Sequence, residues 1–354
     1  MYEKNVVCRH FHFITQSRFL TIPEITLSSA FDTIYLVPLR GAVSTYADDT
    51  LNAGDPAVLA SVATVLNTYT THRLDYSDIR FAGITDRTDG SGIHCDAGPC
   101  AAALTPLPLS LPLSSPLPEP KALHSLAAKL MWVGRVARPD ILTSATHLAK
   151  ILNPTGADAR RANDTLAAIA LHPISLHYIS LDAASLCLDV YADYSGSATF
   201  PLDRRQLGYL VALVDASRRF SLLHWASHRL HRVCPVSCAG ELLALADAVA
   251  AALDVRLLLQ KLLSRRIPLA TYTDSSAAYD LVTSFKHPTD VTAKNDLFML
   301  LCSLLPGTIH TIFLVQGAHN PADALLKPSY ARPAPNRALT NALLAGTLHV
   351  PVIS

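Results

Sequence analysis

The chain has 354 residues, half of them apolar and only 16% charged, which excludes an intrinsically disordered protein and leaves room for about two domains with buried cores. Its 29 Lys and Arg are balanced by 28 Asp and Glu, so the net charge of +1 excludes a general basic surplus as the basis of nucleic-acid binding. Seven Cys without a regular spacing, and no secretory signal pattern ahead of them, predict reduced thiols and an intracellular protein.

Two uncharged stretches, residues 97–118 and 297–322, are long enough to cross a membrane, but the sequence argues against both. The first holds six prolines, which a spanning helix could not accommodate. The second is interrupted by Pro306-Gly307 and carries polar residues such as His310 and Asn320. No membrane partner is therefore expected.

Hydrophobic patterns in the first half of the chain predict short strands and then helices. Strands are predicted at residues 33–37, 41–46 and 79–84, with a helix at 57–69. Residues 104–120, rich in Leu, Pro and Ser, predict an extended linker at a domain boundary rather than a packed element. Three helices are predicted beyond it, at residues 121–135, 140–152 and 158–170.

The second half of the chain predicts a mixed α/β sheet domain. Strands are predicted at residues 186–193, 207–214, 220–225, 268–273 and 308–315. Helices are predicted at residues 240–263, 277–284 and 294–305, and a last helix opens at 321–326. Strands 186–193, 207–214 and 220–225 follow one another closely enough to pair antiparallel, while helices separate the later strands.

Four carboxylates lie at the ends of these predicted elements: Asp193, Glu241, Asp274 and Asp323. Such residues can converge at one rim of a sheet, where they repel one another unless a cation neutralises them. Oxygen ligands without His or Cys suit Mg²⁺ or Mn²⁺, and two such ions can stabilise the attacking and leaving oxygens of a phosphoryl displacement. For each residue taken alone, a helix-capping or turn role is the alternative.

These residues and their surroundings resemble the ribonuclease H domain of copia-type retrotransposon polyproteins. The resemblance rests on the strings YADYSGSA, DRRQLGYLVAL, LLHWASHR, AGELLAL, YTDSSAA and NPADALLK. It implies a ribonuclease H-like mixed sheet with flanking helices. One departure is Gly240, a weak helix residue directly before Glu241.

The resemblance extends upstream to a reverse transcriptase. Tyr46-Ala47-Asp48-Asp49 is similar to the Y-x-D-D turn of a polymerase palm, and Arg138-Pro139-Asp140-Ile141 resembles the stretch between polymerase and ribonuclease H. Only 47 residues precede Asp48, too few for the upstream palm aspartate and the fingers, so we expect no polymerase activity from Asp48 and Asp49 in this chain alone.

The implied domain organisation has five parts. These are a truncated palm remnant (1–103), a Pro-rich linker (104–120), a helical connection region (121–180), a ribonuclease H-like domain (181–330) and a C-terminal tail (331–354).

The resemblance implies a nuclease that cleaves the RNA strand of an RNA–DNA hybrid with two Mg²⁺ or Mn²⁺ ions. Asp193 would bridge the ions, Glu241 and Asp274 would complete one site, and Asp323 would complete the other. Candidate contacts to the nucleic acid are Arg218, Arg219, Arg229 and Lys294. A complete reverse transcriptase chain is a second candidate partner.

Several alternatives stay open at this point. The chain could be a non-catalytic, nucleic-acid-binding relic of a retrotransposon, which its balanced charge favours. Asp189, on the same strand face as Asp193, could be the real ligand. His319 could transfer protons near Asp323, although a turn residue is the simpler interpretation. The loop residues His228, His231, Cys234 and Cys238 have spacing that could hold zinc, or could form an ordinary polar loop.

Overall fold

The computed structural model describes most of the chain from residue 84 onward and isolated strands before it. The described residues are 34–37, 41–46, 49–54, 60, 78–81, 84–89, 91–109, 112–172, 174–196, 205–230, 234, 236–286, 288, 290–328 and 337–353. For the strands before residue 84, the description covers the backbone alone.

Two antiparallel sheets form the N-terminal part. The first contains β1 (Ile34–Val37), β2 (Gly41–Tyr46) and β3 (Asp49–Gly54), and the second β4 (Asp78–Phe81), β5 (Ile84–Asp89), β6 (Gly92–Asp96) and β7 (Leu176–Ile179). The single strand predicted at 79–84 is therefore two strands, β4 and β5, which pair as a hairpin. The helix predicted at 57–69 lies outside the described residues, apart from Ala60.

A helical unit follows, close to the predicted boundaries. It contains α2 (Gly98–Ala102), α3 (Pro120–Val136), the short 3-10 helix η2 (Pro139–Ile141), α4 (Leu142–Ala149) and α5 (Gly156–Leu171). The segment predicted as an extended linker, residues 104–120, contacts this helical unit. Its described residues form no helix or strand before α3 begins, but Asn163 of α5 hydrogen-bonds both the backbone N–H and the carbonyl of Leu107, at 2.8 Å each. The segment is packed against α5.

The second half of the chain forms a five-stranded mixed sheet. Its strands are β8 (Cys187–Ser195), β9 (Gln206–Val214), β10 (Phe220–Arg229), β11 (Leu269–Thr273) and β12 (Thr311–Leu314). The order across the sheet is β10-β9-β8-β11-β12, antiparallel from β10 to β8 and parallel from β8 to β12. The connecting helices are α6 (Ser237–Leu263), α7 (Ser276–Ser284) and α8 (Val291–Leu304). The predicted fold class of this half, a mixed sheet with flanking helices, is confirmed.

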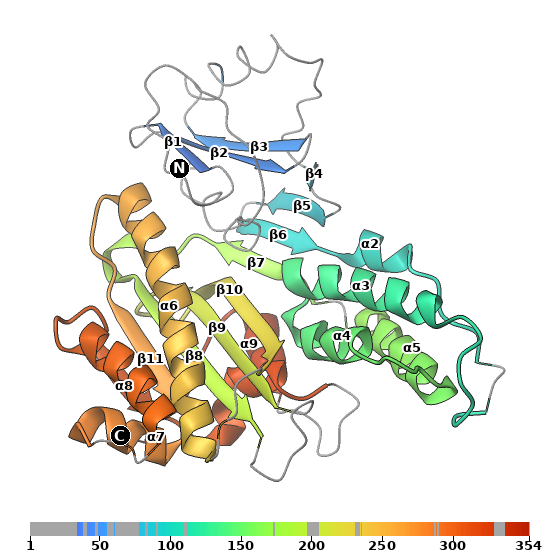
Figure 1. Ribbon diagram of the computed structural model, residues 1–354. Coiled ribbons are helices and arrows are strands. Elements are labelled where there is room, and N and C mark those ends of the chain that lie inside the picture. The colour runs from blue at the N-terminus through green and yellow to red at the C-terminus, as the bar shows by residue number, and fades with distance from the viewer. Residues whose placement is uncertain are drawn as a thin grey trace.

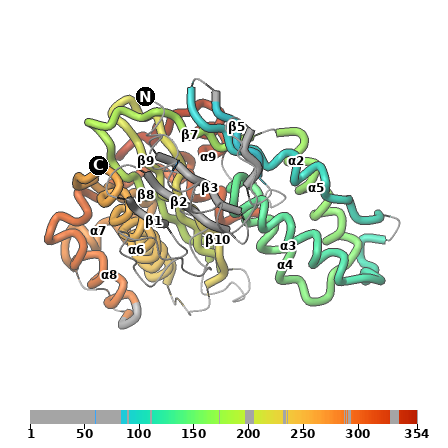
Figure 2. Tube along the Cα trace, turned by 90° about the horizontal axis from the view of Figure 1, so that it is seen from above, coloured from blue at the N-terminus to red at the C-terminus, as the bar shows by residue number. Residues whose placement is uncertain are grey.

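Both faces of this sheet are covered. Figure 1 shows α6 lying across β8 and β9, and α4 contacts β10. Every residue of β9 is buried, so the strands are not half-exposed as an alternating pattern suggests. Trp225 of β10 is buried, and its indole N–H donates to the carbonyl of Gly134 in α3 at 2.9 Å. The view in Figure 2 places α7 and α8 at one end of the molecule and α2–α5 at the other.

The predicted C-terminal tail is part of the sheet domain where it is described. Helix α9 (Ala338–Ala345) packs on the 3-10 helix η6 (Pro321–Leu325), and Leu339 and Leu348 are buried. The backbone N–H of Leu348 donates to Arg218 at 2.9 Å, and that of Ile353 to Leu314 at 2.8 Å. Residues 337–353 thus contact the β9–β10 turn and the outer strand β12.

Within the described part of the chain, no helix is both long enough and apolar enough to cross a membrane.

Candidate metal centre

Strand topology places the two aspartates of the candidate site next to each other. β8 and β11 run parallel and adjacent, so their carboxyl ends meet at one edge of the sheet. Asp193 lies near the end of β8, and Asp274 directly follows β11. Glu241 lies in the first turn or two of α6, which packs on β8. The fold therefore brings three elements that are distant in sequence to one rim.

The side chains of Asp193, Glu241 and Asp274 meet at this rim. Each offers one carboxylate oxygen, and these oxygens all lie within 4.8 Å of one another. In an octahedral magnesium site with bonds of about 2.1 Å, adjacent ligands are about 3.0 Å apart and opposite ligands about 4.2 Å. The three oxygens are therefore close enough together to be candidate ligands of one ion. We call these three residues the carboxylate cluster.

Gly240 allows α6 to approach β8 this closely. A Cβ atom at Gly240 would lie 2.3 Å from the ring of Tyr194, the residue that follows Asp193. The weak helix residue noted in the sequence therefore fits the packing: a side chain there would require either the Tyr194 ring or α6, which carries Glu241, to shift.

Burial and mutual repulsion raise the pKa values of the cluster. Burial raises the pKa of Asp193 strongly, and the charges of Asp274 and Asp323 raise it further. Burial and then the charges of Asp193 and Asp274 raise the pKa of Glu241 to about 9. Burial also raises the pKa of Asp274, although a hydrogen bond from Asn320 opposes this. At neutral pH the cluster must therefore hold protons or a cation.

A hard divalent cation fits these residues. The Oε2 atom of Glu241 is buried and has no hydrogen-bond partner among the described residues, and Glu241 as a whole is only 8% exposed. Burying an unpaired carboxylate oxygen is costly, and a metal ion would satisfy it. The donor set contains only oxygen, which is the preference of Mg²⁺ and Mn²⁺.

Asn320 holds Asp274 in place, a contact that sequence reasoning did not assign. It is fully buried, and its Nδ2 donates to Asp274 Oδ1 at 3.3 Å and to the carbonyl of Ala192 at 3.0 Å. One amide thus bridges the ends of β8 and β11. The only sequence signal for it is its place in the string NPADALLK.

Asp323 lies beside the carboxylate cluster but is not one of the three residues that share the 4.8 Å group. Its charge raises the pKa of both Asp193 and Asp274, so it acts on the same site. Its Oδ1 accepts a hydrogen bond from Lys327 Nζ at 2.6 Å. Sequence reasoning did not single out Lys327, whose spacing of four residues from Asp323 is the only available signal.

Asp189, the alternative to Asp193, has a partner of its own. Its Oδ2 forms an ion pair with Arg218 Nη2 at 2.8 Å and accepts a hydrogen bond from the Tyr191 hydroxyl at 3.3 Å. It lies four residues before Asp193, about 13 Å away along the strand. The structure therefore places Asp193, not Asp189, in the carboxylate cluster.

Two of the four basic candidates, Arg218 and Arg219, form ion pairs within the chain. Arg218 pairs with Asp189, and Arg219 pairs with Asp215 at 2.6 Å. Both lie in the β9–β10 turn, at the end of the sheet opposite to Asp193. A contact of these two residues with nucleic acid stays a prediction. Arg229, at the other end of β10, and Lys294, in the first turn of α8, lie toward the end of the sheet that carries the cluster.

The described part of the His/Cys loop forms no metal-ligand group. His228 Nε2 faces Asp247 Oδ2 at 3.6 Å, Cys234 is buried, and His231 lies outside the described residues. Among the described residues, the carboxylate cluster is the one set of three ligands within 4.8 Å.

The remaining candidates take ordinary positions or cannot be placed. His319 is exposed in the short helix η5 (Gly317–His319). Asp48 lies outside the described residues, and Asp49 begins β3, paired with Tyr46 at the end of β2.

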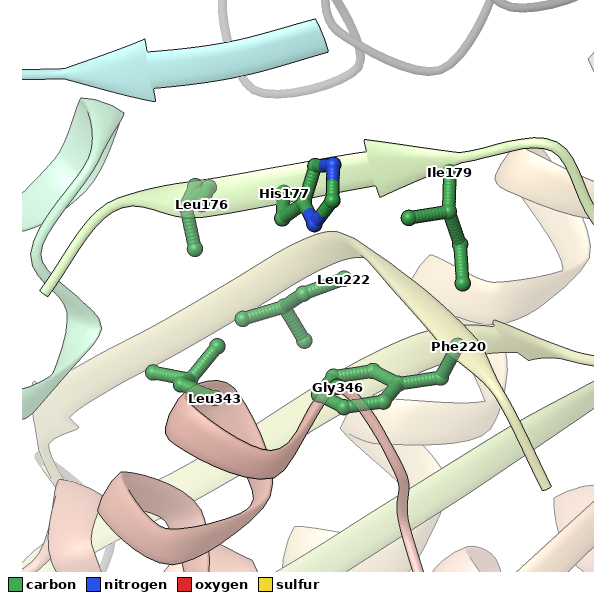
Figure 3. Close-up of a pocket in the computed structure, with 7 residues that line it drawn as sticks. All are labelled: Leu176, His177, Ile179, Phe220, Leu222, Leu343 and Gly346. Carbon is green, nitrogen blue, oxygen red and sulfur yellow. The ribbon is translucent and has the colours of Figure 1, made fainter. Parts of the chain in front are cut away.

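A small cavity lies away from the carboxylate cluster (Figure 3). It has about 20 Å³ of space, room for roughly one water molecule. Its lining residues are Leu176, His177, Ile179, Phe220, Leu222, Leu343 and Gly346. The His177 ring stacks on His94 with centroids 3.8 Å apart. Phe220 begins β10, at the sheet end opposite to Asp193, so this cavity is not part of the candidate site.

No protein-family model and no curated protein matches the sequence. Among solved structures, RNase H1 from the halophilic archaeon Halobacterium salinarum is 18% identical and covers 44% of this chain and 98% of its own, with a TM-score of 0.29. LC11-RNase H1 in complex with an RNA/DNA hybrid is 14% identical and covers 45% of this chain and 99% of its own, with a TM-score of 0.29.

A further similarity extends beyond the five-stranded sheet. The protease-reverse transcriptase of prototype foamy virus is 14% identical, with a TM-score of 0.28. The alignment covers 78% of this chain but only 43% of the viral protein, so the chain spans less than half of that protein's length. At such low identities and TM-scores, these similarities assign no role to an individual residue of this chain.

Proposed function

We propose that this chain is a ribonuclease H-type endonuclease that cleaves the RNA strand of RNA–DNA hybrids, derived from a copia-type retrotransposon polyprotein. The observation that carries the proposal is the carboxylate cluster, in which three acidic side chains from separate elements meet within 4.8 Å and one buried oxygen of Glu241 lacks a partner in the described chain. Such a site is built to bind a divalent cation, and the sequence resemblance connects it with phosphodiester hydrolysis.

In this proposal, Asp193, Glu241 and Asp274 hold one divalent ion, and Asp193 and Asp323 hold a second. When bound, the ions supply Lewis acidity that activates water and stabilises the leaving oxygen. Asn320 fixes the direction of the Asp274 carboxylate through its bond at 3.3 Å. Gly240 keeps Glu241 against the end of β8, so that the ligands are held before the substrate binds.

The substrate is proposed to be an RNA–DNA hybrid that crosses the cluster end of the sheet. Arg229 and Lys294, which lie toward this end of the sheet, are the proposed phosphate contacts nearest the cluster, and Lys294 is exposed at the start of α8. Selection of the RNA strand would depend on groove shape and 2′-hydroxyl contacts rather than base identity. A complete reverse transcriptase chain would supply the polymerase function, because Asp48 and Asp49 represent a single palm turn.

The second candidate function is a non-catalytic nucleic-acid-binding relic. It is favoured by the ion pair between Lys327 and Asp323, which engages the fourth carboxylate. Hybrid cleavage separates the two functions. We expect purified protein to cleave a labelled RNA–DNA hybrid in Mg²⁺ but not in EDTA, and to leave the matching DNA duplex intact. Glu241→Gln should abolish cleavage. An intact hybrid bound by the wild-type protein would favour the relic.

A further inference from the structure

Helix α3 presents one face whose charges are all positive. Lys121, Lys129 and Arg135 are exposed, and the helix, Pro120–Val136, contains no Asp or Glu. At about 100° per residue, these three side chains lie within an arc of about 120°, and the partly buried Trp132 lies on the same arc. We call Lys121, Lys129 and Arg135 the basic face of α3. A helix that is simply solvated usually mixes charges of both signs, so this face indicates an anionic partner.

The basic face is not neutralised within the described part of the chain. None of its three cations forms an ion pair with another described residue, whereas Arg161 of α5 pairs with Asp158. The face is about 21 Å long, since each helical residue adds about 1.5 Å. Successive phosphates of one nucleic-acid strand advance by about 3.4 Å, so the face has the length of about six of them. A polyanion fits it better than a single phosphate does.

Further basic side chains connect this face with the cluster end of the sheet. Helix α4 contacts both α3 and β10, on the β10 side of the sheet (Figure 1). Lys150 follows α4, and partial burial and then the charge of Arg229 lower the pKa of Lys150 to about 8. The carbonyl of Ile151, the next residue, lies 2.8 Å from Nε2 of His124 in α3. Positive charge therefore continues from the end of β10, past α4, to α3.

We propose that the basic face of α3 binds the phosphate backbone of a nucleic-acid duplex that extends beyond the carboxylate cluster. This inference rests on the proposed function, which places the duplex at that end of the sheet. Two strand spacings of about 4.8 Å and two further spacings of about 10 Å separate α3 from Asp193, which is roughly eight base pairs of duplex. Contacts to phosphates position the duplex without reading its sequence.

The first test is binding of an RNA–DNA hybrid of about 20 base pairs to the full chain in EDTA, measured by fluorescence anisotropy at several salt concentrations. The variant is Lys121→Gln/Lys129→Gln/Arg135→Gln. Its affinity at about 0.1 M salt should be at least about tenfold weaker than that of the wild type. The slope of the logarithm of the binding constant against that of the salt concentration should become shallower by about 2 to 3, because about three phosphate contacts are lost.

The second test separates the basic face from the carboxylate cluster. In Mg²⁺, the same variant should cleave the hybrid of about 20 base pairs with a KM at least about tenfold higher and an unchanged kcat. A hybrid of about 8 base pairs, which extends only about 14 Å to either side of the cleaved bond, should show the wild-type KM. An equal rise in KM for both lengths would overturn the position assigned to the basic face.

Two control variants keep the comparison matched. Lys121→Arg/Lys129→Arg/Arg135→Lys keeps the three charges and should bind as the wild type does. Lys261→Gln/Arg265→Gln/Arg266→Gln removes three charges ahead of β11, at the end of the sheet opposite to the cluster, and should also bind as the wild type does.

The two proposals can fail separately. If the variant of the basic face binds the long hybrid as tightly as the control at residues 261–266, the role of α3 is overturned, and cleavage by the wild type leaves the proposed function standing. If the variant loses affinity but the wild-type protein cleaves no hybrid, the nuclease is rejected and the binding surface on α3 remains.

Discussion

Strand β8 carries two buried aspartates, and the negative charge of each is compensated in a different way. Asp189 is 1% exposed and Asp193 is 6% exposed. Asp189 is paired with Arg218 and receives a hydrogen bond from Tyr191, whereas Asp193 is surrounded by further carboxylates. The first end is a closed ion pair that the fold completes by itself. The second is an excess of negative charge that needs protons or a cation, which is why we propose it as the functional end.

The largest expected effect of this difference is on catalysis. Asp193→Asn keeps the shape of the side chain but removes a charge from the carboxylate cluster. Hybrid cleavage in Mg²⁺ should fall by about 1,000-fold or more, because several kcal/mol of transition-state stabilisation depend on the bound ions. The variant should stay folded and become more heat-stable without metal, since repulsion within the cluster is reduced. Cleavage at the wild-type rate would reject Asp193 as a ligand.

The matched change at the other end of β8 should affect stability instead. Asp189→Asn leaves Arg218 without its ion-pair partner, and breaking a buried pair costs about 3 kcal/mol. Urea unfolding should show this loss in the free energy of unfolding, while Mn²⁺ affinity of the folded protein stays as in the wild type. A weaker Mn²⁺ affinity with unchanged stability would exchange the roles assigned to the two aspartates.

The pH dependence of stability should also reflect the carboxylate cluster. Burial and repulsion raise the pKa of Asp193 and Asp274, and that of Glu241 to about 9, so the folded state binds more protons than the unfolded state above the ordinary carboxyl pKa of about 4. Stability contributed by these groups therefore falls as the pH rises from about 5 to 9 in EDTA.

Thermal unfolding at several pH values measures this slope. Mg²⁺ should flatten it, because the ion replaces the protons. Asp193→Asn should flatten it as well. A slope that is the same in EDTA and in Mg²⁺ would show that the cluster does not bind the ion.

A smaller effect is expected from substitution of Gly240, because this change alters packing without removing a charge. Gly240→Ala places a methyl group 2.3 Å from the Tyr194 ring, and such overpacking costs about 1–3 kcal/mol. Because Glu241 shifts with the helix, Mn²⁺ affinity should also decrease. In combination with Tyr194→Leu, which removes the ring, part of the affinity should return. An alanine at 240 that changes neither stability nor affinity would contradict the packing argument.

The sequence predicted the sheet strands, the long helix and the three residues of the carboxylate cluster because these depend on local signals. Asp193, Glu241 and Asp274 each lie at the boundary of a strongly patterned element, and parallel strands end at a common edge. Strand β7 escaped prediction because its four residues are short and pair with β6, about 80 residues earlier in the chain. The pairing of His94 with His177 has no local signal.

Contacts that depend on three-dimensional packing could not be predicted. The composition of the Leu- and Pro-rich segment predicts an extended linker. Its hydrogen bonds to Asn163, through the backbone of Leu107, have no signal in the sequence. From the sequence alone, Arg218 could belong to a basic patch or could form an ion pair with Asp189. The register of β8 against the strand that leads into the β9–β10 turn decides between these two possibilities. Lys327 contacts Asp323 from just beyond the short 3-10 helix η6.

The most direct test of the central claim is the position of a bound ion. In crystals grown with Mn²⁺, anomalous scattering should show an ion bonded to Asp193, Glu241 and Asp274 at the carboxyl ends of β8 and β11, with Asp189 still paired to Arg218. An ion bound elsewhere, such as at His228, or a cluster whose three carboxylates stay unligated at saturating Mn²⁺, would contradict the assignment of this rim as the metal centre.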